Sequence, residues 1–394
     1  MRRSTILPLC VSRSVGPVVI FVLLSGQALA DYCIPVGTWA IPSAHGAVRA
    51  SAREVLLSVS KRSVVLLGER HERAEHHRWQ LQTLAGLLAQ RENLVLGFEM
   101  FPRRVQGVLD RWVAGELSET KFLEAADWTR VWGFATEHYL PLFHFARLNR
   151  IPMLALNVER SLIRALGRKG TDAVPEAMRE GVGPPAAASP AYVRELYAIY
   201  LEHPESTKVT QDDPDFRRFV QGQLTWDRAM AEAIRDAIAG HPQRQVVAVM
   251  GRGHTGQGAV PHQLRDLGIA DVAVLLPWER TPECERLTPE IATAVFSVEA
   301  PRAIAKLPER PRLGIVLKTT ERSVVRIDRV VNGSIAESAG LRSGDVLLKV
   351  AGGVVKAVSD VQRAVHRQAP GTWLPLRVSR DGAELELVAK FPPE

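Results

Sequence analysis

The chain has 394 residues, of which 46% are hydrophobic and 24% charged, and its formal net charge is +7. This composition is ordinary for globular protein, and the length exceeds one compact core of typical size, so we expect more than one domain. Lysine and arginine are spread among aspartate and glutamate rather than clustered with aromatic residues, which argues against a nucleic-acid partner.

Residues 1–30 resemble an export signal. Three arginines flank or precede the apolar stretch "VGPVVIFVLLSG", which ends in Ala-Leu-Ala at 28–30. This pattern predicts a secretory signal peptide cleaved before Asp31, and hence a periplasmic protein. The alternative is association with the membrane, but the stretch is shorter than the roughly 20 residues of a spanning helix. Removal of the three arginines, with no acidic residue, would lower the net charge from +7 to +4.

Cysteine usage follows from export. Cys10 would leave with the signal, so Cys33 and Cys284 would remain in an oxidising compartment. We predict a disulfide between them. Two separate thiols are the alternative, because sequence does not show whether the two Cα atoms come within reach.

The segment from residue 50 to 280 alternates short apolar runs with longer helical patterns, which predicts an α/β fold with a parallel-rich sheet flanked by helices. The runs lack polar alternation, as expected of strands buried on both faces. The expected strands are residues 63–67, 93–98, 151–156, 245–250 and 271–276. Helical spacing marks residues 76–90 and 225–239.

The predicted organisation has five parts. These are a signal peptide (1–30), an α/β domain (31–280) with a helical insertion at about 171–215, a linker (281–310) and a small β-rich domain (311–394). The insertion is either a helical flap over the site or a surface excursion without a role in chemistry.

Polar residues follow four of the five expected strands. They are Glu69 and His71, Glu99, Asn157 and His254. Ligands bind at the carboxyl ends of the strands in open α/β sheets, so we expect these side chains to converge.

Two strand ends share the pattern Gly-x-x-His, at 68–71 and 251–254. One such histidine alone is more often structural, but the two together, beside Glu69 and Glu99, favour a shared functional site. Other motifs fit poorly. "HERAE" has Glu75 where a zinc-protease helix needs its second histidine, and there is no P-loop, nucleophile elbow or dinucleotide loop in the right register.

The stretch 132–147, "WGFATEHYLPLFHFAR", is an aromatic-rich helical pattern. A haem could lie against it, and Tyr139 could offer a phenolate to ferric iron. The alternative is an aromatic stripe packed in the core.

The segments "LLGERH", "LGFEMFPRRVQ", "WGFATEHYLPLFHFAR", "IPMLALNVER", "FVQGQLTWDRAMA" and "VMGRGHTGQGAVPHQL" resemble the ChaN-type haem-binding family. This family is similar to the group with TraB- and Tiki-type metalloproteases and the erythromycin esterases. The resemblance covers about residues 50–280 and implies haem near the strand ends and a homodimer holding two stacked haems. It also implies tyrosine coordination of the iron, which we match to Tyr139. The chain departs from lipoprotein members in lacking a convincing lipid-modified cysteine.

Residues 311–394 combine strand-like segments with one helical pattern, "SDVQRAVHRQ". The blocks "RLGIVL", "VVNGSIAESAGLRSGDVLLKVAGGVV" and "PGTWLPLRVSRDG" resemble a PDZ domain of bacterial periplasmic proteases. The resemblance implies that an extended peptide adds to a sheet edge and that Leu313, Gly314 and Ile315 form the loop holding its carboxylate. The alternative is a module used only for packing or dimerisation.

Our first hypothesis is an exported haem-binding protein in haem uptake or handling, docked to an envelope protein or a peptide C-terminus by its PDZ module. We expect His71, His254 and Tyr139 to contact iron or propionates, and Arg252 to pair with a propionate. The full expected cofactor site comprises Glu69, His71, Tyr139, Asn157, Arg252 and His254.

The alternative is a hydrolase, dependent on a metal or on histidine and glutamate, in which Glu69 or His71 activates water. Glu69, His71, Glu99 and His254 suit a divalent metal by ligand type. A scaffold with a vestigial pocket is a third hypothesis. We favour the haem-binding protein over an enzyme because of the resemblance at the aromatic helix.

Overall fold

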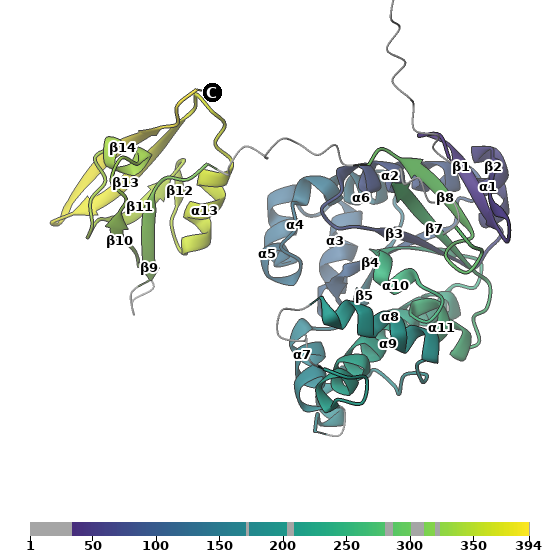
Figure 1. Cartoon of the computed structure of the whole chain (residues 1–394). Coiled ribbons are helices and arrows are strands. Elements are labelled where there is room, and N and C mark those ends of the chain that lie inside the picture. The colour runs from purple at the N-terminus through teal and green to yellow at the C-terminus, as the bar shows by residue number, and fades with distance from the viewer. Residues whose placement is uncertain are drawn as a thin grey trace, which may run out of the picture. The chain divides into compact units, whose positions relative to one another are not determined.

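The computed structural model describes residues 34–170, 173–202, 209–279, 287–300, 311–319 and 324–393. The expected signal peptide and the Cys33–Cys284 pair lie outside these residues. The chain divides into two compact units, Met1–Ala300 and Pro301–Glu394 (Figure 1). Each unit is described by itself below.

The first unit is built on an eight-stranded sheet with the order β2-β1-β8-β7-β3-β6-β4-β5. The strands are β1 (Trp39–Ser43), β2 (Gly46–Ala50), β3 (Val64–Glu69), β4 (Leu94–Pro102), β5 (Met153–Asn157), β6 (Gln245–Gly251), β7 (Val272–Glu279) and β8 (Ala294–Val298). The run from β8 to β5 is parallel, whereas β1 pairs antiparallel with both β2 and β8.

The predicted fold class is confirmed, since β3 to β7 are the five expected strands. The hairpin of β1 and β2 was not predicted, because β1 is only five residues long and the partly exposed residues of β2 form no continuous apolar run. The expected linker over residues 281–310 is wrong at its centre. Residues 294–298 form β8, whose side chains are largely buried between β7 and β1.

Helices cover both faces of the sheet (Figure 1). One layer contains α1 (Ala52–Val59), α2 (Ala74–Leu88), α3 (Gln106–Ala114), α4 (Glu119–Ala125), α5 (Trp128–Val131) and α6 (Thr136–Leu148), after the short η1 (Arg103–Val105). The other includes α9 (Pro214–Gly240) and α11 (Val260–Asp266), with α7 (Arg160–Lys169) and α10 (Arg252–Thr255) nearby. Alternate residues of β3 serve the two layers: Val65 and Leu67 face the first, and Val64 and Leu66 the second.

The predicted insertion contains η2 (Glu176–Met178) and α8 (Pro190–Leu201). Tyr192 and Leu196 of α8 pack with Phe216 and Leu224 of α9 in a separate apolar cluster. The insertion is therefore held against α9, the helix that also carries part of the polar site described below.

The second unit is a β-rich domain, as predicted. Its strands are β9 (Ile315–Thr319), β10 (Val325–Val330), β11 (Val346–Val350), β12 (Gly353–Val354), β13 (Trp373–Arg380) and β14 (Ala383–Lys390), with helices α12 (Ile335–Ser338) and α13 (Val358–His366). The sheet order β14-β13-β11-β10-β9 leaves β9 at an edge. Its core contains Ile327, Leu374 and Val378 and is separate from the cores of the first unit.

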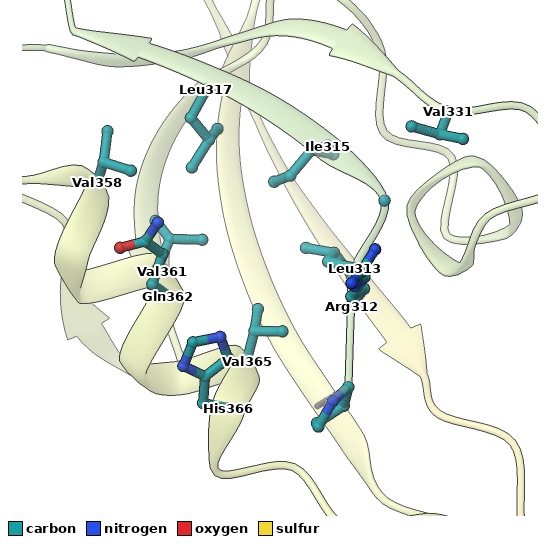
Figure 2. A pocket seen from close by; sticks show the side chains of 12 residues that line it. Arg312, Leu313, Ile315, Leu317, Val331, Val358, Val361, Gln362, Val365 and His366 are labelled. Carbon is teal, nitrogen blue, oxygen red and sulfur yellow. The ribbon is translucent and has the colours of Figure 1, made fainter. Parts of the chain in front are cut away.

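A groove of about 430 Å³ lies between β9 and α13. Figure 2 shows apolar side chains on both sides: Leu313, Ile315 and Leu317 on the strand side, and Val358, Val361 and Val365 on the helix. Gly314 turns the chain into β9 with φ +84°, and a Cβ there would lie 2.2 Å from Cβ of Ser334. Only glycine satisfies both conditions, so the loop predicted from Leu313, Gly314 and Ile315 has the expected backbone.

Candidate functional site

The site of the first unit is assembled where three neighbouring parallel strands end. Glu69 ends β3 and is in register with Gly251, which ends β6. Glu99 lies in β4, on the other side of β6, and accepts a hydrogen bond from the Gly251 amide. Two carboxylates therefore flank Gly251, as expected from convergence at the strand ends.

Glu69 is buried and fully engaged. Its Oε1 accepts from Nδ1–H of His71 at 2.8 Å and from the Tyr139 hydroxyl at 2.7 Å, and its Oε2 accepts from Gln80 at 3.1 Å. Burial alone would raise the pKa of Glu69, but the hydrogen bond from His71 and the neighbouring imidazoles outweigh burial and lower it. Glu69 is therefore an ionised group that orients its neighbours and has no free face for a ligand.

His71 is the accessible member of this cluster, with 27% of its side chain exposed while that of Glu69 is fully buried. Its ring lies edge-on to Trp132 at 4.6 Å and beside Phe134 at 4.9 Å, between ring centroids. Because Nδ1 is held by Glu69, Nε2 is the nitrogen left for a ligand; among the described contacts it has no hydrogen-bond partner. A Cβ at Gly251 would lie 2.8 Å from Cε1 of His71, so glycine is required for this ring position.

His254 lies in a second cluster, with both ring nitrogens facing carboxylates. Nδ1–H donates to Asp227 at 2.6 Å, and Nε2 lies 3.5 Å from Oε1 of Glu99. The Tyr192 hydroxyl of α8 donates to the other oxygen of Asp227 at 2.7 Å. Burial alone would lower the pKa of His254, but Glu99 and Asp227 raise it to about 9. Both ring nitrogens of His254 thus have carboxylate neighbours, and iron ligation by His254, which stays a prediction, would require one of these contacts to change.

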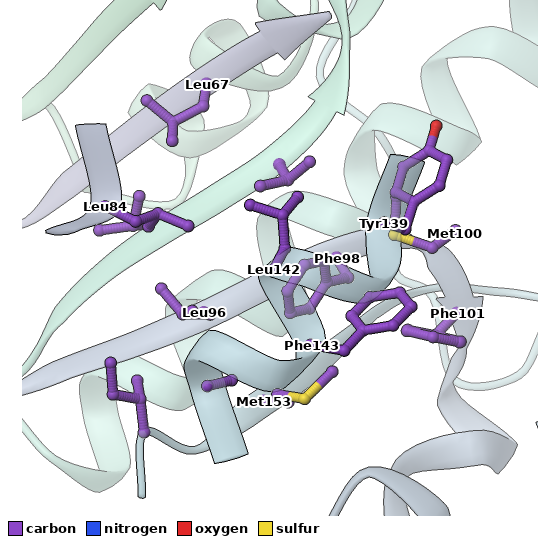
Figure 3. Packing of buried hydrophobic residues seen from close by; sticks show 14 of the residues in the cluster. Leu67, Leu84, Leu96, Phe98, Met100, Phe101, Tyr139, Leu142, Phe143 and Met153 are labelled. Atoms are coloured by element: carbon purple, nitrogen blue, oxygen red, sulfur yellow. The ribbon is translucent and has the colours of Figure 1, made fainter. Parts of the chain in front are cut away.

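Tyr139 is fully buried in the aromatic cluster of α6. Figure 3 shows its ring at the edge of that cluster, with the hydroxyl pointing away from Phe98 and Phe143. The hydroxyl donates to Glu69. Burial and the Glu69 charge raise the pKa of Tyr139 well above its ordinary value, which opposes the phenolate that iron would require. Iron ligation by Tyr139 stays a prediction, and it would require the hydroxyl to leave Glu69.

The other two expected cofactor contacts have different surroundings. Asn157 donates to the Glu99 carbonyl at 2.8 Å and accepts from the Val158 amide, so its side chain joins the ends of β4 and β5. Arg252 lies over the Trp278 ring at 5.0 Å, and no carboxylate within the described ranges forms an ion pair with it. Asn157 is therefore a positioning residue, whereas Arg252 is free to meet an anion.

A basic pocket of about 200 Å³ adjoins the His71 cluster through Trp132. Its polar wall comes from α5, η1 and the start of α7. The charged residues lining it are Arg104, Arg130, Glu159, Arg160 and Arg164.

In the part of the chain that the structure describes, no group of three or more His, Cys, Asp or Glu residues is arranged to hold a metal ion. Glu69, His71, Glu99 and His254, expected from the sequence to form a divalent-metal site, are therefore not arranged as such a group among these residues. Within the same residues, no helix has the length and apolar character needed to cross a membrane.

The family model described as "Haem-binding uptake, Tiki superfamily, ChaN" matches residues 55–264, more than half of the chain. The chain belongs to the ChaN family. The ChaN match spans β3 to β6 and thus includes both Glu–His clusters. A second model, described as a PDZ domain, matches residues 311–390.

A solved ChaN structure from Campylobacter jejuni, titled as showing cofacial heme binding, superposes with a TM-score of 0.52. It is 19% identical and covers 66% of this chain and 98% of that chain, a likeness that shows the ChaN fold alone. Two curated relatives are probable periplasmic serine endoproteases, DegP-like, from Chlamydia trachomatis (38% identical over 68 residues, 16% of this chain) and Chlamydia muridarum (39% over 71 residues, 17%). The chain spans only 14% of the length of either one.

The donor set at His71 fits the haem that the ChaN family is described as binding. A ligating histidine usually donates its second ring N–H to a carboxylate, which fixes the tautomer and directs the other nitrogen at the metal. Glu69 and His71 form such a pair, and Trp132 and Phe134 supply apolar contact beside it. Of the three predicted iron contacts in this ChaN-type domain, His71 is the one whose surroundings suit ligation.

Sequence reasoning missed Asp227, Trp132 and the arginines of the basic pocket. Asp227 had a readable signal, because it is an acidic residue on the apolar side of the helical pattern 225–239. Arg160 and Arg164 are four residues apart, which places them on one side of a helix. Nothing in that spacing shows that the helix begins beside Trp132.

Proposed function

We propose that the chain binds haem at the carboxyl ends of β3, β4 and β6, where His71 would hold the iron, and that it acts in haem uptake or handling. The observation that carries the proposal is the hydrogen bond from Nδ1 of His71 to the buried Glu69 carboxylate. This bond leaves Nε2 as the ring nitrogen that faces a ligand. Burial alone would lower the pKa of His71, but Glu69 and Glu99 raise it, so iron would have to compete with a proton for Nε2.

The surroundings of Glu69 support this role. Tyr139 and Gln80 donate to its carboxylate, so Glu69 keeps its charge and position without solvent. Trp132 and Phe134 would contact the porphyrin, and arginines beside the site would meet the charge of its propionates. The protein thus supplies orientation, apolar contact and charge, and the haem is its cargo.

We also propose a homodimer in the haem-bound state. The His71 side chain is 27% exposed, so a haem bound to it would lie at the surface and not in an enclosed cavity. A haem at this site would therefore keep one face uncovered. A second haem-bound chain would cover that face, in keeping with the cofacial heme binding named for the Campylobacter jejuni protein.

The second unit is proposed to dock the chain to another envelope protein. Its edge strand β9 and the apolar groove beside α13 suit an extended peptide with an apolar C-terminus. Export to the periplasm is proposed from the signal pattern at residues 1–30.

The test is a hemin titration of the purified chain without residues 1–30, followed by the Soret band. We expect a saturable shift in the wild type. His71→Ala should weaken binding at least tenfold, whereas Tyr139→Phe, which removes only a hydrogen bond to Glu69, should retain most of it. The proposal fails if the wild type gives no shift, or if His71→Ala binds as the wild type does and Tyr139→Phe does not.

A second candidate function is hydrolysis without a metal. The observation that favours it is the same Glu69–His71 pair, because an imidazole oriented by a carboxylate can take a proton from water. Glu99 and the His254 imidazolium lie on the other side of Gly251 and could stabilise developing charge.

Hydrolysis of an activated ester, measured with wild type and His71→Gln, separates the two candidates. Turnover in the wild type that His71→Gln abolishes, together with no Soret shift on adding hemin, would favour the hydrolase. A Soret shift without turnover leaves the haem-binding function standing.

A further inference from the structure

The basic pocket carries more positive than negative charge. Arg104 forms an ion pair with Glu159, and Arg130 forms one with Asp127. Arg160 and Arg164 line the same pocket and have no ion-pair partner among the residues that the structure describes. Two guanidinium groups are therefore uncompensated in a small concave space.

The pocket is continuous with the proposed haem site. Trp132 contacts the His71 ring, and the Arg160 guanidinium lies 5.5 Å from the centroid of the same indole. The same indole lines the pocket. A planar ligand that rests on Trp132 beside His71 would thus present its edge to Arg160.

We propose that Arg160 and Arg164 form a subsite for the propionate carboxylates of haem. The inference rests on the proposed haem-binding function and adds the residues that orient the porphyrin edge. A guanidinium offers two parallel N–H groups that match a carboxylate, and Arg keeps its charge at any physiological pH. The Ser161 hydroxyl, also in the pocket, can donate to the same group.

The paired arginines of the pocket explain why Arg160 and Arg164 are the available ones. Arg104 and Arg130 already meet carboxylates, so a propionate would have to displace Glu159 or Asp127 to reach them. A hydrogen bond to a charged group is stronger than a neutral one, so each unpaired guanidinium should strengthen haem binding by about tenfold.

The test compares hemin with hemin dimethyl ester, which keeps iron and ring but lacks propionate charge. The chain without residues 1–30 is titrated as wild type and as Arg160→Gln/Arg164→Gln. A matched control is Arg168→Gln/Lys169→Gln, which removes the same charge from the exposed far end of α7. The expected result is that the first double variant loses about a hundredfold in affinity for hemin but binds the ester as the wild type does, while the control binds both normally.

Other outcomes overturn the inference in distinguishable ways. Unchanged hemin affinity in Arg160→Gln/Arg164→Gln would exclude the subsite while leaving haem binding at His71 intact. Equal weakening toward hemin and ester would mean that the arginines support the fold and do not bind propionate. A wild type that binds neither compound would refute the proposed function itself, and the subsite with it.

Discussion

At the scale of single residues, the site depends on which imidazole nitrogen is free. His71 and His254 come from the same Gly-x-x-His pattern, yet Glu69 holds only Nδ1 of His71, whereas His254 faces a carboxylate at each nitrogen. Neighbouring carboxylates raise the pKa of both histidines, but only His71 keeps a ring nitrogen, Nε2, without a hydrogen-bond partner among the described residues. Identical motifs at adjacent strand ends thus differ in which imidazole nitrogen a ligand could reach.

Gly251 should be sensitive to a single methyl group. We expect Gly251→Ala to displace the His71 ring, because the new Cβ would lie 2.8 Å from Cε1, and to weaken hemin binding about tenfold. Gly253→Ala is the matched control, since a Cβ there meets nothing within 4 Å. Equal hemin affinities of the two variants would contradict the close fit of His71 against the end of β6.

The buried His254 imidazolium makes stability depend on pH. Its folded pKa of about 9 lies above the ordinary 6.5, so its contribution is fully present below pH 6.5 and is lost as pH rises through 9. We compare the free energy of unfolding of the wild type with that of His254→Gln. The advantage of the wild type should be about 3 kcal/mol larger at pH 6 than above pH 9.

Urea unfolding of the wild type and of His254→Gln, from pH 6 to pH 9.5, measures this difference in the free energy of unfolding. His45→Gln, in the exposed turn between β1 and β2, serves as the control. A gap between wild type and His254→Gln that stays constant from pH 6 to pH 9.5 would show that His254 is neutral in the folded chain.

At the scale of elements, α13 and β9 define a groove whose apolar lining should select the peptide. The helix contributes Val358, Val361 and Val365 at three and four spacing, so one stripe faces the strand. Two of these valines, Val361 and Val365, are also buried in the domain core. Of these three valines, Val358 is the least buried, so it can be changed with least effect on folding.

We predict that Val358→Thr weakens binding of a peptide ending in valine by about threefold to tenfold, because the hydroxyl is desolvated without changing the shape of the side chain. Val354→Thr, 61% exposed in β12 and outside the groove, should bind normally. Fluorescence polarisation with a free and an amidated C-terminus measures both effects. Equal binding of the amidated peptide would exclude recognition of the terminal carboxylate.

At the scale of the whole molecule, the two units have separate cores. The sheet of the first unit is packed on both faces by its own helices, and the core of the second contains only residues from 313 onward. Each unit therefore buries its apolar side chains without the other, which is the condition for independent unfolding.

Calorimetry of the full chain should show two unfolding transitions. Hemin should raise the midpoint of one, and a peptide ending in valine should raise the midpoint of the other, because a ligand stabilises only the unit that binds it. At a hundredfold excess over Kd the stabilisation is about 2.7 kcal/mol. A single transition, or a peptide that shifts both, would show that the units unfold together.

Much of the fold was predictable because buried segments have recognisable runs of apolar residues in the sequence. A strand covered on both faces must be apolar at every position, so β3 to β7 are readable as runs, and the polar residues that end them mark the site. The same holds for Gly314, where a positive φ and a close neighbour leave glycine as the suitable residue. The strands at one end of the sheet, β2, β1 and β8, carry weaker patterns, and the linker prediction failed at β8.

The sequence by itself thus determined the layered α/β unit, the β-rich unit and the set of strand-end residues. Only the tertiary structure decided their roles. It brought Asp227 of α9 to His254, turned the Tyr139 hydroxyl to Glu69, and set Arg160 over Trp132. The physical reason is that hydrogen-bond partners and free nitrogens depend on how α6, α7 and α9 pack against the sheet, and periodicity along the chain reports only that they pack.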